Sequence, residues 1–234
     1  MYLSDLTGRG VRVAVIDSGV HASHPHVGGV AGGFGIRDDG SIVDDYVDRL
    51  GHGTAVVAAI REKVPNAEII AIKVFWQTLA TTAAMLTHAI ERASAQRVQV
   101  INLSLGTAEI HHRARLQAAV LCARKEGAIV VSAQRDGGVL WLPGSLDAVI
   151  AVRADPSLER GAYDVRIVED RPVLVTSPYP REIPGVPRER NLHGVSFAVA
   201  NASAFVTRAL EGSPGAHAAA LFGILRGAAC APIA

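Results

Sequence analysis

Three glycine-flanked segments of this chain each hold one side chain of a type used in nucleophilic catalysis. Asp17 follows an apolar run in Val-Ala-Val-Ile-Asp-Ser-Gly, His52 lies in Gly-His-Gly-Thr, and Ser196 lies in Gly-Val-Ser-Phe-Ala. A serine hydroxyl is a weak nucleophile near neutral pH, so it needs a base within hydrogen-bond reach, and the base needs an orienting partner. The order Asp, His, Ser predicts a triad in which Ser196 attacks, His52 moves the proton and Asp17 holds the imidazole.

Each of these residues also has an ordinary structural explanation. Asp17 fits a turn at the end of a strand, His52 fits the first turn of a helix, and Ser196 fits an N-cap, which is a common position for serine. Three such coincidences in this order and in these contexts are improbable. The triad is therefore the favoured interpretation.

The elements that would position the triad alternate along the chain. Short β-branched runs predict strands at residues 11–16, 69–74, 98–103, 129–133, 149–152 and 173–176. Apolar positions at helical spacing predict helices at residues 52–63, 79–95, 113–125, 195–211 and 216–225. Apolar strands between amphipathic helices indicate an α/β fold, a doubly wound, largely parallel sheet with helices on both faces. Ligands of such sheets bind beyond the carboxyl ends of the strands, which is where Asp17 is expected.

The composition fits one α/β domain over residues 1–234, with the charged, proline-rich segment 155–190 forming loops around a short strand pair. The hydrophobic share is 49%, the charged share 19% and the net charge +1, so no nucleic-acid or membrane partner is indicated. Cys122 and Cys230 are expected to be unpaired, because one lies in a helical pattern and the other near the terminus. We expect a cytoplasmic protein without a pro-segment, since no secretory signal precedes the first strand.

Several segments together resemble the subtilisin-type (subtilase) serine peptidase family. The resemblance rests on the blocks around the three triad residues and on Val-Ile-Asn-Leu-Ser-Leu-Gly at 100–106, and it covers most of residues 10–210. The chain is similar to a divergent, short member of this family, and the resemblance implies the family's sheet and triad. It also implies that Ser104, Leu105 and Gly106 form an edge that pairs with the backbone of a peptide substrate. An ordinary strand end is the alternative for these three residues.

The sequence departs from the family pattern at the oxyanion loop. The family carries an Asn whose side chain donates to the oxyanion, and this chain has Arg135 at that position. Three alternatives are open: Arg135 donates instead, Gln134 replaces the Asn after a small loop shift, or the hole is incomplete and the activity low or absent. The backbone N–H of Ser196 is the donor that survives in each case. The serine block is also altered, because the family's Met and later Pro are absent here.

Two more residues are expected near the substrate pocket. If Pro143 and Gly144 match the family's Tyr-Pro-Gly, Trp141 replaces a small residue at the pocket floor. A bulky indole there favours small side chains before the scissile bond, whereas Asp136 at the rim attracts a basic one. Core packing is the alternative role for Trp141.

No metal site is predicted. The histidines at 21, 24 and 26 lack a partner cluster and are interpreted as structural, and His111 and His112 as exposed polar residues that open a helix. The family often uses calcium, but the acidic segment matches no tight oxygen cage and is expected to be a solvated loop holding Asp38, Asp39, Asp44, Asp45 and Asp48. No cofactor is therefore expected.

The expected function is a serine endopeptidase that cleaves peptide bonds through an acyl-enzyme. An unselective protease would be harmful in the cytosol, so we expect narrow specificity, such as removal of the leader segment of a precursor peptide. The rival hypothesis is a degenerate family member that binds peptides, or supports an active partner subunit, without cleaving. Arg135 and the altered serine block motivate that rival.

Overall fold

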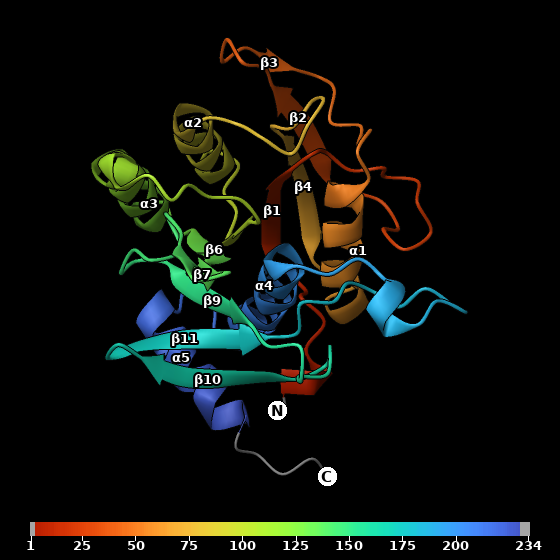
Figure 1. Cartoon of the computed structure of the whole chain (residues 1–234), viewed down its shortest axis with the longest axis vertical. Coiled ribbons are helices and arrows are strands. Elements are labelled where there is room, and N and C mark those ends of the chain that lie inside the picture. Colours follow the sequence, from red (N-terminus) through yellow and green to blue (C-terminus); the bar gives the residue numbers. More distant parts are fainter. Residues whose placement is uncertain (1–2, 230–234) are drawn as a thin grey trace.

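A nine-stranded sheet forms the centre of the computed structural model, which describes residues 3–229 (Figure 1). The strands lie in the order β10-β11-β9-β6-β5-β1-β4-β2-β3. The pairs from β11 to β2 are all parallel, and only the two outer pairs, β10–β11 and β2–β3, are antiparallel. The strand bounds are β1 Arg12–Asp17, β2 Gly32–Ile36, β3 Ile42–Val43, β4 Glu68–Lys73, β5 Val100–Leu103, β6 Ile129–Ala133, β9 Ile150–Ala154, β10 Tyr163–Val168 and β11 Arg171–Thr176.

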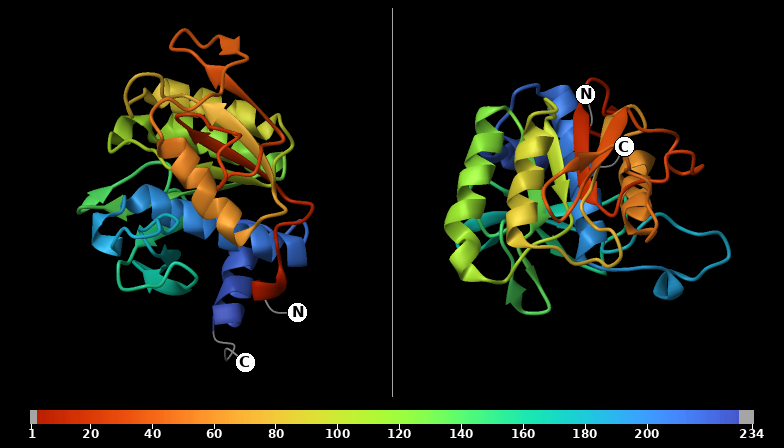
Figure 2. Two further views of the ribbon diagram at one scale, coloured as in Figure 1. Left: turned by 90° about the vertical axis from the view of Figure 1, so that its right-hand side faces the viewer. Right: turned by 90° about the horizontal axis from the view of Figure 1, so that it is seen from above.

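Helices cover both faces of this sheet, which confirms the predicted doubly wound α/β architecture. Their bounds are α1 His52–Lys63, α2 Ala83–Ser94, α3 Arg113–Lys125, α4 Val195–Gly212 and α5 Ala218–Ala229. The helices α2 and α3 pack on one face, and α1 and α4 on the other, as the view from above shows (Figure 2, right). No described helix is both long and apolar enough to cross a bilayer.

The central strand β1 contributes side chains to two separate hydrophobic cores. Val13 and Val15 belong to the core with α1, α4 and α5, whereas Ala14 and Ile16 belong to the core with α2 and α3. Successive side chains of a strand point to opposite faces, so a strand buried on both sides is apolar throughout. This explains why the run from Val13 to Ile16 is continuously hydrophobic rather than alternating.

One helix begins later than the sequence predicts. The second helix begins only at Ala83, because the side chain of Thr82 caps it by accepting a hydrogen bond from the backbone N–H of Met85. The predicted start at Leu79 is wrong, and that side chain is 53% exposed. The segment 155–190 does contain the expected strand pair, β10 and β11, which joins the main sheet through β9.

The oxyanion loop forms a β-hairpin that the sequence analysis did not anticipate. Strands β7 (Arg135–Asp136) and β8 (Val139–Leu140) are antiparallel, and the turn between them is Gly137–Gly138. Both glycines have positive φ angles, 52° and 82°. Two-residue hairpin turns of this kind favour Gly-Gly, because L side chains rarely adopt that conformation.

Candidate active site

The side chains of Asp17 and His52 are hydrogen-bonded to each other. Asp17 ends β1 and is fully buried, and its Oδ1 lies 2.7 Å from Nδ1 of His52, the first residue of α1. The close approach depends on Gly53, since a Cβ atom there would collide with the backbone oxygen of Gly19. The carboxylate thus fixes the tautomer of the imidazole, with Nδ1 donating and Nε2 free to accept a proton.

The pKa of His52 is raised above its usual value. Burial favours the neutral imidazole and alone would lower this pKa, but the hydrogen bond and charge of Asp17, with the charge of Asp48, outweigh burial. The second carboxylate oxygen of Asp17 is buried with no hydrogen-bond partner among the described residues. The imidazole is therefore a better base than an isolated histidine, as the proton-accepting member of a triad must be.

Asp48 organises the loop before α1 and was missed by the sequence analysis, which placed it in a solvated loop. Its side chain is buried and accepts five hydrogen bonds, at Oδ1 from Ser18 Oγ and the N–H groups of Leu50 and Gly51, and at Oδ2 from the N–H and hydroxyl of Thr54. Burial raises the pKa of Asp48, but these hydrogen bonds outweigh it and leave the pKa lowered. An aspartate accepting from residues two and three positions later is an Asx turn, a signal present in the sequence.

Ser196 is the second residue of α4 and lies on the same cleft as His52. Its hydroxyl does not cap the helix, because Gly194 holds the N-cap position without a side-chain bond. Instead, Ser196 Oγ donates to the backbone oxygen of Ser104 at 3.2 Å. The described hydrogen bonds include none between Ser196 and His52. Triad contacts are often looser without substrate than in the reacting complex.

The start of α4 also supplies a backbone donor and a packing surface. In the part of the chain that the structure describes, no acceptor is paired with the backbone N–H of Ser196. The first N–H groups of a helix are unsatisfied within it and favour a negative charge. The next residue, Phe197, is buried, and its ring centroid lies 5.7 Å from that of His52. Phe197 is thus a support for the imidazole that the sequence analysis did not identify.

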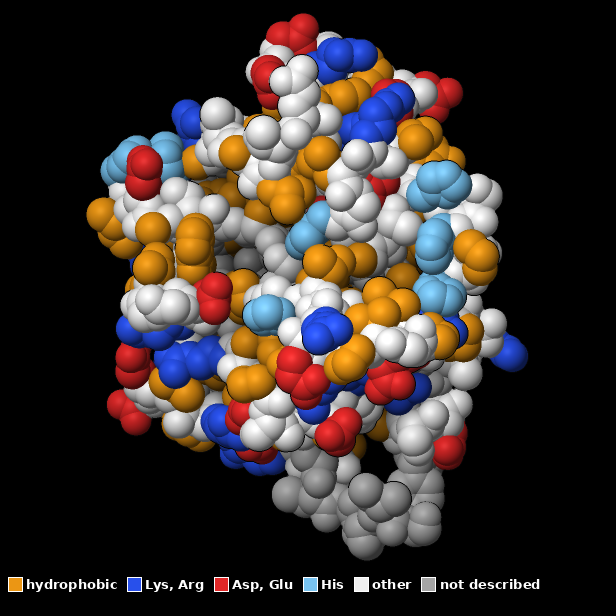
Figure 3. Space-filling model, turned by 45° about the vertical axis from the view of Figure 1, so that its right-hand side comes forward, with side chains coloured by type: hydrophobic (Ala, Val, Ile, Leu, Met, Phe, Trp, Pro, Cys, Tyr) orange, Lys and Arg blue, Asp and Glu red, His pale blue; other side chains and the backbone are white. Residues whose placement is uncertain are grey.

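A cleft of about 230 Å³ joins the candidate catalytic and substrate-binding residues. Its lining comprises His52, Phe75, Leu79, Ser104, Leu105, Gly106, Ala133, Asp136, Trp141, Val195 and Ser196. Figure 3 shows a hollow on this face of the molecule that hydrophobic side chains border. The structure thus brings all the expected substrate-contacting residues to one place and adds Phe75 and Leu79. A larger cavity of about 580 Å³ beside Trp76 holds none of the triad residues.

Arg135 and Gln134 do not line this cleft. The guanidinium of Arg135 lies 3.4 Å from both the backbone oxygen of Gly138 and the carboxylate of Glu169. The side chain of Gln134 is buried, and its Oε1 accepts from Nε of Arg153 at 2.7 Å. Each side chain is therefore engaged away from Ser196.

The other residues considered from the sequence lie apart from the cleft. His24 and His26 pack edge to face in a turn, with ring centroids 5.1 Å apart. Within residues 3–229, the acidic loop before α1 does not bring three metal-ligating atoms together. Cys122 is exposed and free, and Cys230 lies outside the described residues.

Comparisons with known proteins point to one family. The Subtilase family model matches residues 8–155, more than half of the chain. The minor extracellular protease Epr of Bacillus subtilis is 32% identical over 161 residues, which are 64% of this chain and 24% of that protein. Subtilisin NAT of Bacillus subtilis subsp. natto is 28% identical over 222 residues, 88% of this chain and 55% of that protein. The chain thus spans between a quarter and little more than half of these relatives.

The fold is also found among solved structures. A cold-adapted subtilisin-like serine proteinase superimposes with a TM-score of 0.72 at 20% identity, covering 96% of this chain and 84% of that one. The likeness at this identity shows the shared sheet and helices. Together with the family match over residues 8–155, it leads to one conclusion: this chain belongs to the subtilase family.

Proposed function

We propose that this chain is a serine endopeptidase that uses Asp17, His52 and Ser196. The observation that carries the proposal is the 2.7 Å bond between Asp17 and His52 beside a cleft that also holds Ser196. In the first step His52 Nε2 takes the hydroxyl proton while Ser196 Oγ attacks the peptide carbonyl. His52 then gives that proton to the leaving amine, and water releases the acyl group by the same exchange.

The substrate is proposed to bind as an extended strand along Ser104, Leu105 and Gly106. These three residues follow β5 directly and line the same cleft as Ser196. A peptide that adds to a sheet edge gains affinity through backbone hydrogen bonds, and its side chains are selected by pockets. The backbone oxygen of Ser104 already accepts a hydrogen bond from the hydroxyl of Ser196.

The oxyanion is proposed to rest mainly on the backbone N–H of Ser196. That N–H is unpaired at the start of α4, whereas the side chains of Arg135 and Gln134 face other partners. In subtilisin, removal of one side-chain donor from the oxyanion hole costs about 10²–10³ in rate. We therefore expect slow turnover rather than the speed of a digestive protease.

We propose narrow specificity for small side chains before the scissile bond. Trp141 lines a cleft of only about 230 Å³, together with Phe75 and Leu79. Asp136 is exposed on the same cleft and favours a basic group at the rim. A precursor peptide with small residues at its cleavage point fits this cleft. Rapid digestion of unfolded casein by the purified protein would show that narrow specificity is wrong.

A fluorophosphonate probe tests the proposed nucleophile, because it reacts only with an activated serine. We expect labelling of the wild type, loss of labelling in Ser196→Ala, and full labelling in the matched control Ser41→Ala, which changes an exposed loop serine. A folded wild-type sample that takes up no probe would contradict the proposal. That result would support the rival role, peptide binding without cleavage.

A further inference from the structure

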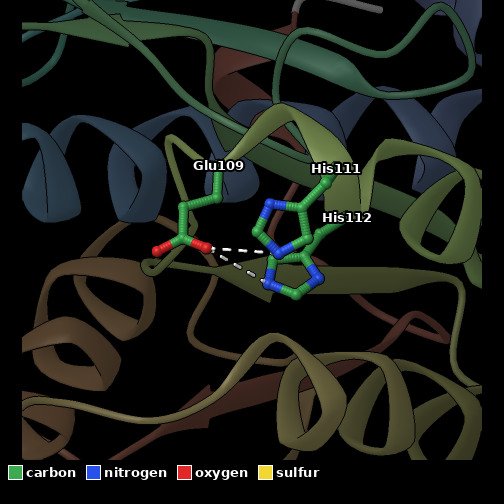
Figure 4. Close-up of side chains that lie close together, drawn as sticks. All are labelled: Glu109, His111 and His112. Atoms are coloured by element: carbon green, nitrogen blue, oxygen red, sulfur yellow. Dashed lines mark ion pairs between the residues drawn. The ribbon is translucent and has the colours of Figure 1, made fainter.

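A second cluster of reactive side chains lies at the start of α3. Glu109, His111 and His112 surround the short 3₁₀ turn Ile110–His112. Figure 4 shows the carboxylate of Glu109 facing both imidazoles. Glu109 Oε2 lies 3.3 Å from Nε2 of His111 and 3.6 Å from Nε2 of His112. Within residues 3–229, this is the one group of three or more His, Cys, Asp or Glu residues that could hold a metal ion.

The spacing of these three atoms fits a tetrahedral zinc site. Zinc binds histidine nitrogen and carboxylate oxygen at about 2.0–2.2 Å, so two ligands of a tetrahedral ion lie about 3.4 Å apart. The two oxygen-to-nitrogen distances, 3.3 and 3.6 Å, bracket that value, and all three ligand atoms lie within 4.8 Å of one another. Two imidazoles with one carboxylate are a donor set that zinc favours. We propose that Glu109, His111 and His112 bind a zinc ion.

The site is open to solvent, so zinc can enter without a change in fold. The side chains of Glu109 and His111 are 64% and 67% exposed, and that of His112 is 27% exposed. Three protein ligands leave a fourth position for water or an incoming group, as in zinc sites that exchange ligands. The two imidazole rings already lie side by side, with centroids 3.9 Å apart and planes tilted by 48°, so little side-chain movement is needed.

The zinc site adjoins the edge that is proposed to bind peptide. The backbone N–H of Glu109 donates to Thr107 Oγ1 at 3.2 Å. A cavity of about 400 Å³ runs from Leu105 and Gly106 to Glu109 and His112. A bound ion would therefore lie on the wall of this cavity. Zinc binding itself does not depend on the proposed peptidase activity, so the two proposals can fail separately.

Calorimetric titration of untagged protein with zinc chloride tests the site. We expect one zinc per chain, with affinity reduced more than about tenfold in His111→Ala, in His112→Ala and in Glu109→Gln. The matched control is His217→Asn, because His217 is an exposed histidine whose ring accepts from the N–H of Ala220 at the start of α5, and asparagine also caps helices. Equal zinc binding by the wild type and all three variants, or no binding by the wild type, would overturn the proposal.

Histidine side-chain NMR of the wild type gives a second measurement that needs no substitution. Zinc should shift the Nε2 resonances of His111 and His112 together, at one equivalent, and leave His217 unchanged. Shifts spread over the other histidines, with His111 and His112 unaffected, would show that zinc binds elsewhere on the surface.

Discussion

The guanidinium of Arg135 lies 3.4 Å from the carboxylate of Glu169, although the two residues are 34 positions apart in the chain. The contact joins the turn between β10 and β11 to the β7–β8 hairpin. It directs Arg135 away from the cleft that holds Ser196. The position that the resemblance equates with the family's oxyanion donor thus forms a contact between two surface hairpins.

The first prediction concerns this arginine. Replacement Arg135→Ala should change kcat for a small peptide substrate by no more than about threefold, because its charged group contacts Glu169 rather than the reacting carbonyl. Glu169→Ala removes the same contact from the other side and is the matched control. Steady-state kinetics of both variants give the measurement. A fall of a hundredfold in Arg135→Ala alone would show that Arg135 swings in and donates to the oxyanion.

The second prediction concerns the pH dependence set by Asp17. His52 must be neutral to accept a proton, so the rate of fluorophosphonate labelling should rise through its pKa, which lies above the usual 6.5. In Asp17→Asn the charge that raises this pKa is gone and burial lowers it, so the midpoint should move to lower pH. The maximal rate should fall by about 10⁴, because the amide no longer holds the correct tautomer. An unchanged midpoint in Asp17→Asn would contradict this assignment.

The third prediction concerns the stability of the loop before α1. Asp48→Ala removes the acceptor of five hydrogen bonds and leaves the buried N–H of Thr54 unsatisfied. We expect a loss of about 2–4 kcal/mol in the free energy of unfolding, measured by urea denaturation. The control Asp45→Ala, which removes an ion pair with the exposed Arg49, should cost less than about 1 kcal/mol. Equal losses in the two variants would contradict the role given to Asp48.

The contribution of Asp48 to the free energy of unfolding should also depend on pH. Its folded pKa is lowered, so the stabilisation is present above the unfolded value of about 3.9 and is lost as the pH falls through the folded value. At pH values below the folded pKa of Asp48, the wild type and Asp48→Ala should approach each other in stability. A difference that stays constant down to pH 2 would show that packing, not the carboxylate charge, is responsible.

The fourth prediction concerns a buried lysine at the end of α1. Lys63 is 6% exposed, and burial lowers its pKa from 10.5 to about 8 despite the nearby Glu62. Between these two pH values the unfolded chain holds more protons at this group than the folded chain, so stability rises with pH. Lys63→Met removes the burial cost and should stabilise the protein at pH 7 by at most about 3 kcal/mol.

Urea unfolding of both forms at pH 7 and pH 10 provides the measurement for Lys63. The advantage of Lys63→Met should shrink at the higher pH, where the wild-type lysine is buried in its neutral form. Lys125→Met, which changes an exposed lysine in the last turn of α3, should show no such pH dependence. A variant less stable than the wild type at both pH values would show that the pairing with Glu62 outweighs burial.

Much of the fold could be predicted because its strands and helices obey simple periodicities. The bounds of α1 and α3 match the predicted helices, since buried apolar side chains recur at helical spacing in each. The start of α2 could not be predicted from periodicity. Leu79 continues the apolar spacing of the helix toward the N-terminus, but the helix begins only after its N-cap, Thr82. Short strands such as β3 and β7 contain only two residues, too few for any period to show.

The candidate site was predictable as a set of residues but not as a geometry. The glycine-flanked blocks led to Asp17, His52 and Ser196, and the structure places His52 and Ser196 on one cleft, with the buried Asp17 bonded to His52. The direction of Arg135 could not be read from the sequence, because it depends on Glu169 in a distant turn. The role of Asp48 could in principle be predicted from its Asx spacing to Leu50 and Gly51. The sequence does not distinguish it from the other acidic residues of the same loop.

The division of β1 between two cores has a consequence for the chemistry at its end. Odd-numbered Val13 and Val15 face the layer of α1, even-numbered Ala14 and Ile16 face the opposite layer, and Asp17 continues the odd series toward His52. Insertion of one residue within this strand would turn the acid to the wrong side of the molecule, and insertion of two would turn it back. The contact between Asp17 and His52 therefore depends on whether the number of residues along this single buried strand is odd or even.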